Sequence, residues 1–402
     1  MIDIDQRIKE LMSRDVVSRD LIQELVPDLL DKHNKVCLEF ATGLGKGKSV
    51  MMCGVGKRVL YVVSMLDQIT NFKLDCEKFG YDWSNYTFVH YNSLSKHENM
   101  VYDLVVLNEG DLIMTDKRLE ALIKINYRQL LVVTARFQLQ DFLAFQQVVG
   151  KVKKWTINLA KAIKWDILIK PTLHVHFVEF DRYNLDYSIK VIKNKNYDLL
   201  TIGIKEVSNF ENRKFNLEIF GNAEDLLRYI EEKIEYYKTE SSVKGWGSKN
   251  KPSYSAMRTF MFGTMRKNLL DKVKLDKVYE LDSRINERKI IIIGSQEDYR
   301  GTGEDFVFYK HKDNQERFAR FNNGELNRLV AMKKLERDIN LVDCNVGIIG
   351  SFGGNISTKM QEIGRLLRGD NPQVHIVLIE DEKDHKNFQW FIKHYTADIV
   401  YH

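Results

Sequence analysis

Residues 38–52 read LEFATGLGKGKSVMM, an apolar run that leads into a glycine- and lysine-rich turn and then into a second apolar run. The residues VCLEF (36–40) predict a buried β-strand, and KSVMMCGVGK (48–57) can follow as a helix. Glycines in such a turn let backbone N–H groups converge on an anion, and the helix N-terminus adds the positive end of its dipole. The stretch therefore predicts a phosphate-binding loop in an α/β domain.

The loop contains two Gly-Lys pairs, and two registers are open. In the first, Lys46 contacts the phosphate, and Gly47 stands where a Ser or Thr hydroxyl usually binds Mg²⁺. In the second, Lys48 contacts the phosphate and Ser49 supplies the hydroxyl, but Thr42 replaces a glycine of the usual pattern. A third interpretation is a plain glycine-rich turn whose basic residues face solvent. The candidate ATP-binding residues are Thr42, Gly43, Leu44, Gly45, Lys46, Gly47, Lys48 and Ser49.

Short apolar runs alternate with amphipathic stretches on both sides of this loop. Such alternation predicts a parallel sheet with helices on both faces. The first series is VCLEF (36–40), VLYVV (59–63), TFVHY (87–91), DLVVL (103–107) and LLVVTA (130–135). The second series is KIIIIG (289–294), FVFYKH (306–311), LNRLVAM (326–332), NVGIIGSF (345–352) and VHIVLIED (374–381). The fold class is therefore α/β, with two such units in tandem.

The part between the two series is less regular, and it sets the predicted domain boundaries. We expect a first domain over 1–155 that begins with two helices, a linker helix and insertion over 156–285, and a second domain over 286–402. The residues 151–171 predict a basic amphipathic helix that ends before Pro171. A strand over 173–180 and a helix near 223–238 follow, and residues 241–255, rich in Gly, Ser and Lys, predict a loop.

The composition is that of an ordinary globular protein. The chain has 402 residues, 44% of them hydrophobic and 29% charged, with a formal net charge of +5. This mild excess of positive charge is compatible with a nucleic-acid partner but does not demonstrate one. No apolar run approaches the roughly 20 residues that a membrane span needs, and the N-terminus lacks the apolar core of a signal peptide. None of the four cysteines forms a C-x-x-C pair, which argues against a zinc knuckle. Cys37 lies in an apolar run and is predicted to be a core residue, and a reducing cytoplasm is the expected compartment.

Acidic residues follow a buried run at YDLVVLNEGD (102–111). Ligands of open α/β sheets bind at the carboxyl ends of the strands, and a carboxylate there can orient or deprotonate a water molecule. Glu109 is the better candidate for this role, because Asn108 carries no charge. Taken alone, however, these residues are better explained as a polar turn that ends a strand.

The segment QEIGRLLRGDN (361–371) carries the second strong pattern. Gln361, Arg365 and Arg368 are spaced to share one face of a helix. Two guanidinium groups directed at one anion suit the charge of a phosphoryl transition state. The alternative is a solvated basic face, with Leu366 and Leu367 packed on the other side.

Together these segments resemble superfamily 2 helicases and translocases, which are nucleic-acid-dependent ATPases with two RecA-like domains. Residues Glu39 to Gly47 resemble motif I, E-x-A-T-G-x-G-K-T, and 108–111 resemble motif II, D-E-x-H. Motif VI, Q-x-x-G-R-x-x-R, is matched fully over 361–368. Weaker similarity covers 320–350, which resembles the region leading into motif V. The chain is most similar in general character to the compact helicases of bacteriophages.

The resemblance implies a role for further residues. Thr134, Ala135 and Arg136 resemble motif III and would couple hydrolysis to movement. Tyr91, Asn92 and Ser93 resemble a turn that contacts nucleic acid. The candidate catalytic residues are Glu109, Gln361, Arg365 and Arg368, and the candidate metal ligands are Ser49, Asn108 and Glu109.

ATP and Mg²⁺ are the implied cofactors, and the implied partner is nucleic acid, with DNA favoured over RNA. We expect a cytoplasmic monomer or small oligomer, in the host cytoplasm if the chain is viral, acting in replication or repair with other proteins of those processes.

The basic stretch 151–164, with Trp155 and Trp165, could add to the nucleic-acid surface, although a solvated linker helix explains it equally well. Gly47 and Asn108 depart from the family pattern, and they favour an alternative, a helicase fold that binds nucleic acid without turnover. A P-loop phosphotransferase fits less well, because the motif VI segment lies more than 300 residues after the loop.

Overall fold

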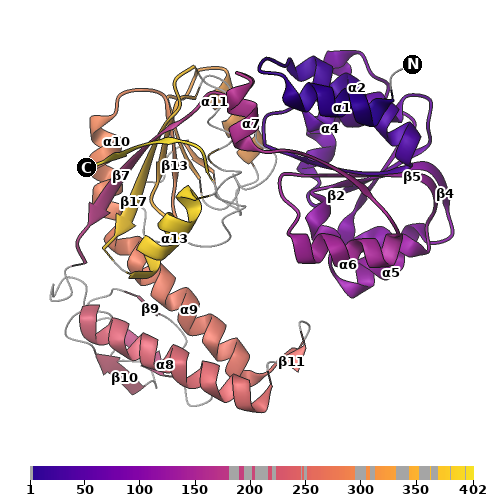
Figure 1. Ribbon diagram of the computed structural model, residues 1–402. Coiled ribbons are helices and arrows are strands. Elements are labelled where there is room, and N and C mark those ends of the chain that lie inside the picture. The colour runs from indigo at the N-terminus through magenta and orange to yellow at the C-terminus, as the bar shows by residue number, and fades with distance from the viewer. Residues whose placement is uncertain are drawn as a thin grey trace.

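The computed structural model shows two α/β lobes and a smaller insertion (Figure 1). It describes residues 3–180, 190–193, 202–203, 216–219, 223–245, 247–248, 251–294, 305–307, 313–331, 344–352, 363, 370–380, 382–393 and 395–402. The lobes lie side by side, and the insertion extends from the second lobe.

The first lobe is a six-stranded sheet in the order β3-β2-β4-β5-β1-β6, and every strand pair in it is parallel. Its strands are β1 (Lys35–Phe40), β2 (Val59–Val63), β3 (Tyr86–His90), β4 (Val101–Asn108), β5 (Asn126–Thr134) and β6 (Lys153–Ile157). Its helices are α1 (Ile4–Ser13), α2 (Arg19–His33), α3 (Lys46–Gly54), α4 (Asp67–Phe79), α5 (Asp116–Ile123), α6 (Leu139–Val149) and α7 (Leu159–Lys164), with 3-10 turns η1 (Tyr91–His97) and η2 (Gly110–Ile113).

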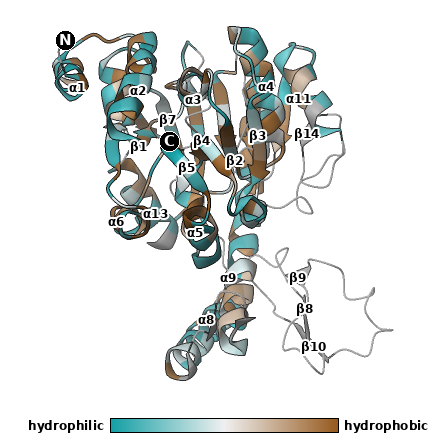
Figure 2. Cartoon of the chain, turned by 90° about the vertical axis from the view of Figure 1, so that its right-hand side faces the viewer, coloured by the Kyte–Doolittle hydropathy of each residue, from teal (hydrophilic) through white to brown (hydrophobic). Residues whose placement is uncertain are grey.

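Alternate side chains of these strands enter two cores, one on each face of the sheet. On β1, Val36, Leu38 and Phe40 pack with helices α1 to α4, whereas Cys37 joins the core under α5 and α6. Because successive strand residues point to opposite faces, strands covered on both sides are apolar throughout. Figure 2 shows β2 and β4 coloured as hydrophobic, between layers of helices that carry most of the hydrophilic colour. The predicted core position of Cys37 is confirmed, since this residue is completely buried.

The second lobe is a seven-stranded parallel sheet in the order β14-β15-β13-β16-β17-β7-β18. Its strands are β7 (Thr172–Val178), β13 (Lys289–Ile292), β14 (Phe306–Val307), β15 (Arg328–Ala331), β16 (Val346–Ile349), β17 (Gln373–Ile379) and β18 (Asp398–Tyr401). Its helices include α10 (Leu275–Arg284) on one face and α11 (Asn314–Asn322) and α13 (Glu382–Ile392) on the other. The predicted fold class, two tandem RecA-like α/β domains with a partly helical insertion, is confirmed.

The insertion is formed by residues between β7 and α10. It contains α8 (Ala223–Lys244), packed on α9 (Tyr254–Val273), a hairpin of β11 (Gly247–Ser248) and β12 (Lys251–Pro252), and a small antiparallel sheet. The strands of that sheet are β8 (Lys190–Lys193), β9 (Ile202–Gly203) and β10 (Asn216–Ile219). Helix α9 continues from the insertion into the second lobe, where Leu270 and Val273 pack on Ile379 (Figure 1).

Two predictions about this region are wrong. Residues 151–171 do not form one long helix, because Lys153–Ile157 joins the first sheet as β6 and only Leu159–Lys164 is helical. Trp155 lies in β6 with its ring edge-on to Phe40, which the alternating pattern of a strand permits. In the predicted loop 241–255, α8 continues to Lys244 and a short hairpin precedes α9.

Strand β7, which falls within the range predicted as linker and insertion, pairs with β17 and β18 in the second sheet.

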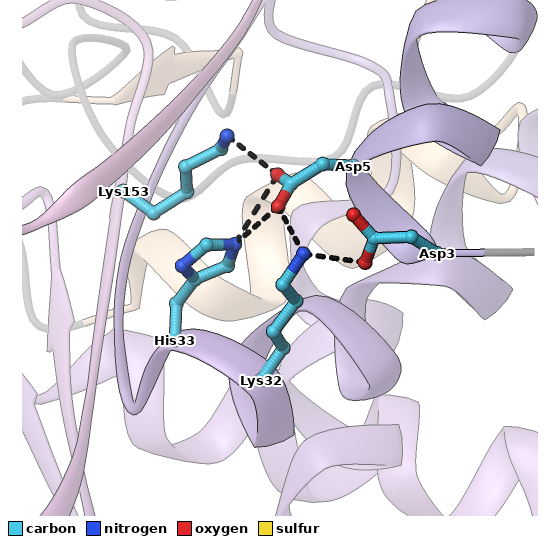
Figure 3. Close-up of polar contacts among 5 residues, drawn as sticks. All are labelled: Asp3, Asp5, Lys32, His33 and Lys153. Atoms are coloured by element: carbon cyan, nitrogen blue, oxygen red, sulfur yellow. Dashed lines mark hydrogen bonds and ion pairs between the residues drawn. The ribbon is translucent and has the colours of Figure 1, made fainter.

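A group of ion pairs connects the start of α1 to α2 and β6 within the first lobe (Figure 3). The carboxylate of Asp5 accepts from Lys32 and His33 at the end of α2 and from Lys153 at the start of β6, and Asp3 also pairs with Lys32. Hydrogen bonds from Lys153 and then Lys32 lower the pKa of Asp5 well below its ordinary value. Among the helices that the structure describes, none combines the length and apolar character needed to cross a bilayer.

Candidate functional site

The glycine-rich turn joins β1 to α3 at the carboxyl edge of the first sheet. Gly45 caps α3 with φ 75°, and Gly43 has φ 97°, both in the region where a side chain is strained. A Cβ on Gly45 would lie 2.0 Å from Nε2 of Gln23, and one on Gly43 would lie 2.8 Å from Cδ2 of Leu168. Both glycines are therefore required by the local backbone and by neighbouring side chains.

The two lysines of the turn point to different places. Lys46 is the first residue of α3, and its Nζ donates to the carbonyl oxygen of Phe40, 2.8 Å away at the end of β1. Lys48 turns toward α2, where its Nζ lies 2.7 Å from Oδ1 of Asp20. The hydrogen bond to Asp20 also raises the pKa of Lys48 above its ordinary value. The Lys46 side chain therefore reaches from the start of α3 back to the end of β1, and so connects the two ends of the turn.

The Ser49 hydroxyl does not line the turn in this arrangement. The side chain is completely buried within α3, and its Oγ has no hydrogen-bond partner among the residues that the structure describes. Gly47 occupies the position after Lys46, so no hydroxyl follows that lysine. Across the described ranges, no group of three or more His, Cys, Asp or Glu side chains is arranged to hold a metal ion. The residue after Lys46 therefore offers no hydroxyl to a metal ion bound beside a phosphate.

Gln23 is a residue of this site that the sequence analysis missed. Its Nε2 donates to the carbonyl oxygens of Leu44 (3.2 Å) and Gly45 (3.3 Å), and the side chain is only 3% exposed. It therefore fixes the turn from α2. A glutamine on the apolar face of α2, between Ile22 and Val26, was the signal that could have revealed it.

The acidic residues after β4 lie at the same sheet edge, two strands from β1. Glu109 has φ 54°, a left-handed conformation that is uncommon for a residue with a side chain. The next residue, Gly110, has no room for a Cβ, which would lie 2.2 Å from Cγ1 of Val132. Tyr91 Oη donates to the carbonyl oxygen of Asn108 at 2.9 Å. The backbone of Glu109 is thus held in a conformation that neighbouring residues enforce.

Thr134, at the end of β5, connects the acidic segment to the residues that follow it. Its Oγ1 lies 2.9 Å from Oδ1 of Asp111, to which it can donate, and it accepts from the backbone N–H of Arg136 at 3.2 Å. Glu39, at the end of β1, accepts from the backbone N–H of Phe137 at 2.7 Å. The ends of β1, β4 and β5 are therefore linked by side chains at one edge, beside the glycine-rich turn.

The three residues of the predicted nucleic-acid turn differ in their exposure to solvent. Tyr91 is 2% exposed, and burial raises its pKa well above the ordinary value, so its ring belongs to the core. Arg118 lies over that ring at 5.3 Å and donates to Oδ1 of Asn92 at 2.7 Å. Asn92 is exposed and Ser93 is half-buried.

The basic stretch 151–164 is bound into the first lobe. Trp155 and Trp165 are 4% and 2% exposed, so neither ring is available to stack on a base. Several of its lysines pair with acidic residues, as in Lys153 with Asp5, Lys154 with Glu39 and Lys164 with Asp15. A structural role therefore accounts for this stretch better than a nucleic-acid surface.

Gln361, Arg365 and Arg368 lie outside the described residues. Of their segment the structure describes Ile363, which is completely buried in a core that also includes Phe352 and Phe388. The loop and the acidic edge are thus brought together by the structure, whereas the position of the twin arginines stays a prediction.

Comparison with known proteins adds two findings. Residues 259–370 match the family model of the helicase conserved C-terminal domain, and the matched range includes the segment QEIGRLLR (361–368). Among solved structures, the chain is similar to the Pyrococcus furiosus Hef helicase domain, with 15% identity and a TM-score of 0.45, covering 93% of this chain and 99% of that one. No curated protein matches the sequence.

Proposed function

We propose that this chain is an ATP-dependent nucleic-acid helicase or translocase that hydrolyses ATP between its two lobes. The observation that carries the proposal is the position of Lys46, whose ammonium bridges the ends of a glycine-rich turn at a helix N-terminus. The match of 259–370 to the helicase C-terminal domain supports assigning the second lobe to the same activity.

In this proposal each group of the first lobe has one task. Lys46 and the backbone N–H groups of the turn bind the β- and γ-phosphates. Glu109 orients or deprotonates the attacking water, and Asp111, two residues later, bonds to Thr134. Arg365 and Arg368 of the second lobe neutralise charge that develops on the transferred phosphoryl group, an effect worth about 10³-fold or more on related chemistry.

Nucleic acid, with DNA favoured over RNA, would cross both lobes and be held mainly through its phosphates, so binding should weaken steeply with salt. Mg²⁺ is expected with ATP in the family, but the residue that follows Lys46 is Gly47, which supplies no hydroxyl to the ion.

The test is steady-state ATP hydrolysis by the full chain, with and without single-stranded DNA. The proposal predicts turnover that DNA stimulates and that Lys46→Ala abolishes. Absence of turnover in the unaltered chain under both conditions would refute it.

One alternative has its own support. Gly47 in place of the hydroxyl, and Asn108 in place of the aspartate of motif II, favour a helicase fold that binds nucleic acid without turnover. Salt-sensitive DNA binding by a chain that does not hydrolyse ATP is the result expected from that alternative.

A further inference from the structure

A contact between the lobes begins at the residue after Ala135. The guanidinium carbon of Arg136, in the first lobe, lies 5.3 Å from the ring centroid of Trp390 on α13 of the second lobe. This distance falls within the range of about 6 Å over which an aromatic ring attracts a cation. Trp390 is 38% exposed, so the pair is neither sealed in a core nor fully solvated.

Arg136 is held at its backbone. Its N–H donates to Oγ1 of Thr134 at 3.2 Å, and the next N–H, that of Phe137, donates to Oε1 of Glu39 at 2.7 Å. The ring of Phe137 packs against Phe142 in the core beneath α6. The Arg136 side chain therefore leaves from a fixed point on the sheet edge.

Trp390 is fixed in a similar way. Phe388 and Phe391, which flank it on α13, are completely buried and pack against Phe352 at the end of β16. Because these two buried phenylalanines fix how α13 packs, they also fix the side of the helix from which Trp390 projects. The contact thus joins two rigid elements rather than two loose side chains.

Arg136 is connected to the acidic residues after β4 through the hydroxyl of Thr134. Thr134 Oγ1, which accepts from Arg136, lies 2.9 Å from Asp111, two residues after Glu109. A cation–π pair shifts an equilibrium by a factor of only about two to thirty. A contact of this strength can be broken and re-formed at a small cost in free energy.

We propose that Trp390 is a positioning residue, which through Arg136 makes the arrangement of Thr134 and Asp111 depend on the position of the second lobe. This inference rests on the proposed function and extends it, because it names the residue of the second lobe that the coupling segment contacts. Trp390 itself does not touch the reacting groups.

The test measures DNA-stimulated ATP hydrolysis in Trp390→Ala, Arg136→Gln and the double variant. Each single change should lower kcat about three- to tenfold, with the KM for ATP altered less than about twofold. The double variant should lose no more than either single one, because the two residues act as one unit. Trp390→Phe and Arg136→Lys should retain most of the activity.

Lys73→Gln provides the matched control. Lys73 lies 3.9 Å from the ring centroid of Trp83, so this change removes a cation–π pair confined to the first lobe. It should leave kcat unchanged. Normal kcat in Trp390→Ala, or losses that multiply in the double variant, would overturn the inference.

A fluorescence measurement separates this inference from the proposed function. Arg136→Gln should change tryptophan emission when Trp390 is present. The same substitution should leave the emission of a Trp390→Phe variant unchanged. If the unaltered chain shows no turnover, the proposed function fails, whatever the emission. If turnover is present but emission and kcat are insensitive to these changes, only the role of Trp390 fails.

Discussion

The Lys48 ammonium lies 2.7 Å from Oδ1 of Asp20, on α2, whereas the Lys46 ammonium lies 2.8 Å from the carbonyl oxygen of Phe40. Two lysines that are equivalent in the sequence pattern are thus directed to different elements. The pairing with Asp20 draws Lys48 away from the turn, which leaves Lys46 as the cation at its opening.

This difference predicts unequal effects of substitution on ATP affinity. Lys46→Ala should weaken binding about tenfold or more, because it removes a charged hydrogen-bond donor to phosphate. Lys48→Ala should change the dissociation constant less than about threefold. Isothermal titration with a non-hydrolysable ATP analogue measures both, and the reverse order would show that the second register is used.

Gln23 should control the shape of the turn. Its amide donates to two carbonyl oxygens, so Gln23→Ala should weaken nucleotide binding about three- to tenfold and lower the free energy of unfolding by about 1–3 kcal/mol. Gln23→Glu is the sharper variant, since an ionised carboxylate of similar size would face those oxygens without a proton to donate. Equal affinity in Gln23→Glu and the unaltered chain would contradict this role.

Four histidines of the second lobe predict an acid-sensitive edge of its sheet. His174 lies 2.9 Å from His402 and His176 lies 3.0 Å from His375, nitrogen to nitrogen, on the adjacent strands β17 and β7 and directly after β18. Burial, with the neighbouring imidazoles, lowers the pKa of His176 to about 4 and that of His375 to about 3. On α10, the charge of Lys277 also lowers the pKa of His176, whereas the charge of Glu280 raises it.

The sign of the pH dependence follows from these shifts. Both pKa values are lower in the folded chain than the ordinary value near 6.5, so protons bind first to the unfolded chain as pH falls. Stability is full above pH 6.5 and should fall below it by up to about 1.4 kcal/mol per pH unit for each histidine. Urea unfolding at pH 7 and pH 5 measures the loss. His375→Gln should reduce it, and a loss unchanged by that substitution would contradict the assignment.

A buried ion pair should dominate the stability of the junction between α9 and α10. Lys274 Nζ lies 2.5 Å from Oδ2 of Asp384, with side-chain exposures of 2% and 10%. Asp384→Ala would leave a buried ammonium without its partner and should cost about 3–5 kcal/mol. Lys274→Met with Asp384→Leu should cost less, about 1–3 kcal/mol, because only the backbone N–H of Ile379 then loses its acceptor. Urea unfolding of the three proteins checks this, and a double variant as unstable as Asp384→Ala would show that packing alone is responsible.

The sequence allowed β1 to β5, β7 and β13 to β17 to be predicted, because strands covered on both faces are continuous apolar runs, but β18 was not predicted. It failed at 151–171, where Val152, Trp155 and Ile157 fit a strand but the lysines and later apolar residues also fit a helix. Periodicity alone cannot decide between the two in so short a stretch. What decided it was the free edge of β1, with which β6 pairs.

The candidate site was predictable only in part for a similar reason. The glycine turn and the acidic edge are local patterns, and both lie where the pattern placed them. The different directions of Lys46 and Lys48 involve Asp20, which lies 28 residues before Lys48 on a packed helix. Gln23 likewise acts through a contact 21 residues away in sequence. Such long-range contacts leave no periodic signal.

A crystal structure of the chain with a non-hydrolysable ATP analogue would show whether both lobes hold the triphosphate. We expect Lys46 Nζ at about 3 Å from a β- or γ-phosphate oxygen, Glu109 facing the γ-phosphate, and Arg365 and Arg368 reaching it from the second lobe. A nucleotide held by Lys48, or bound by one lobe with both arginines directed away from it, would contradict the account.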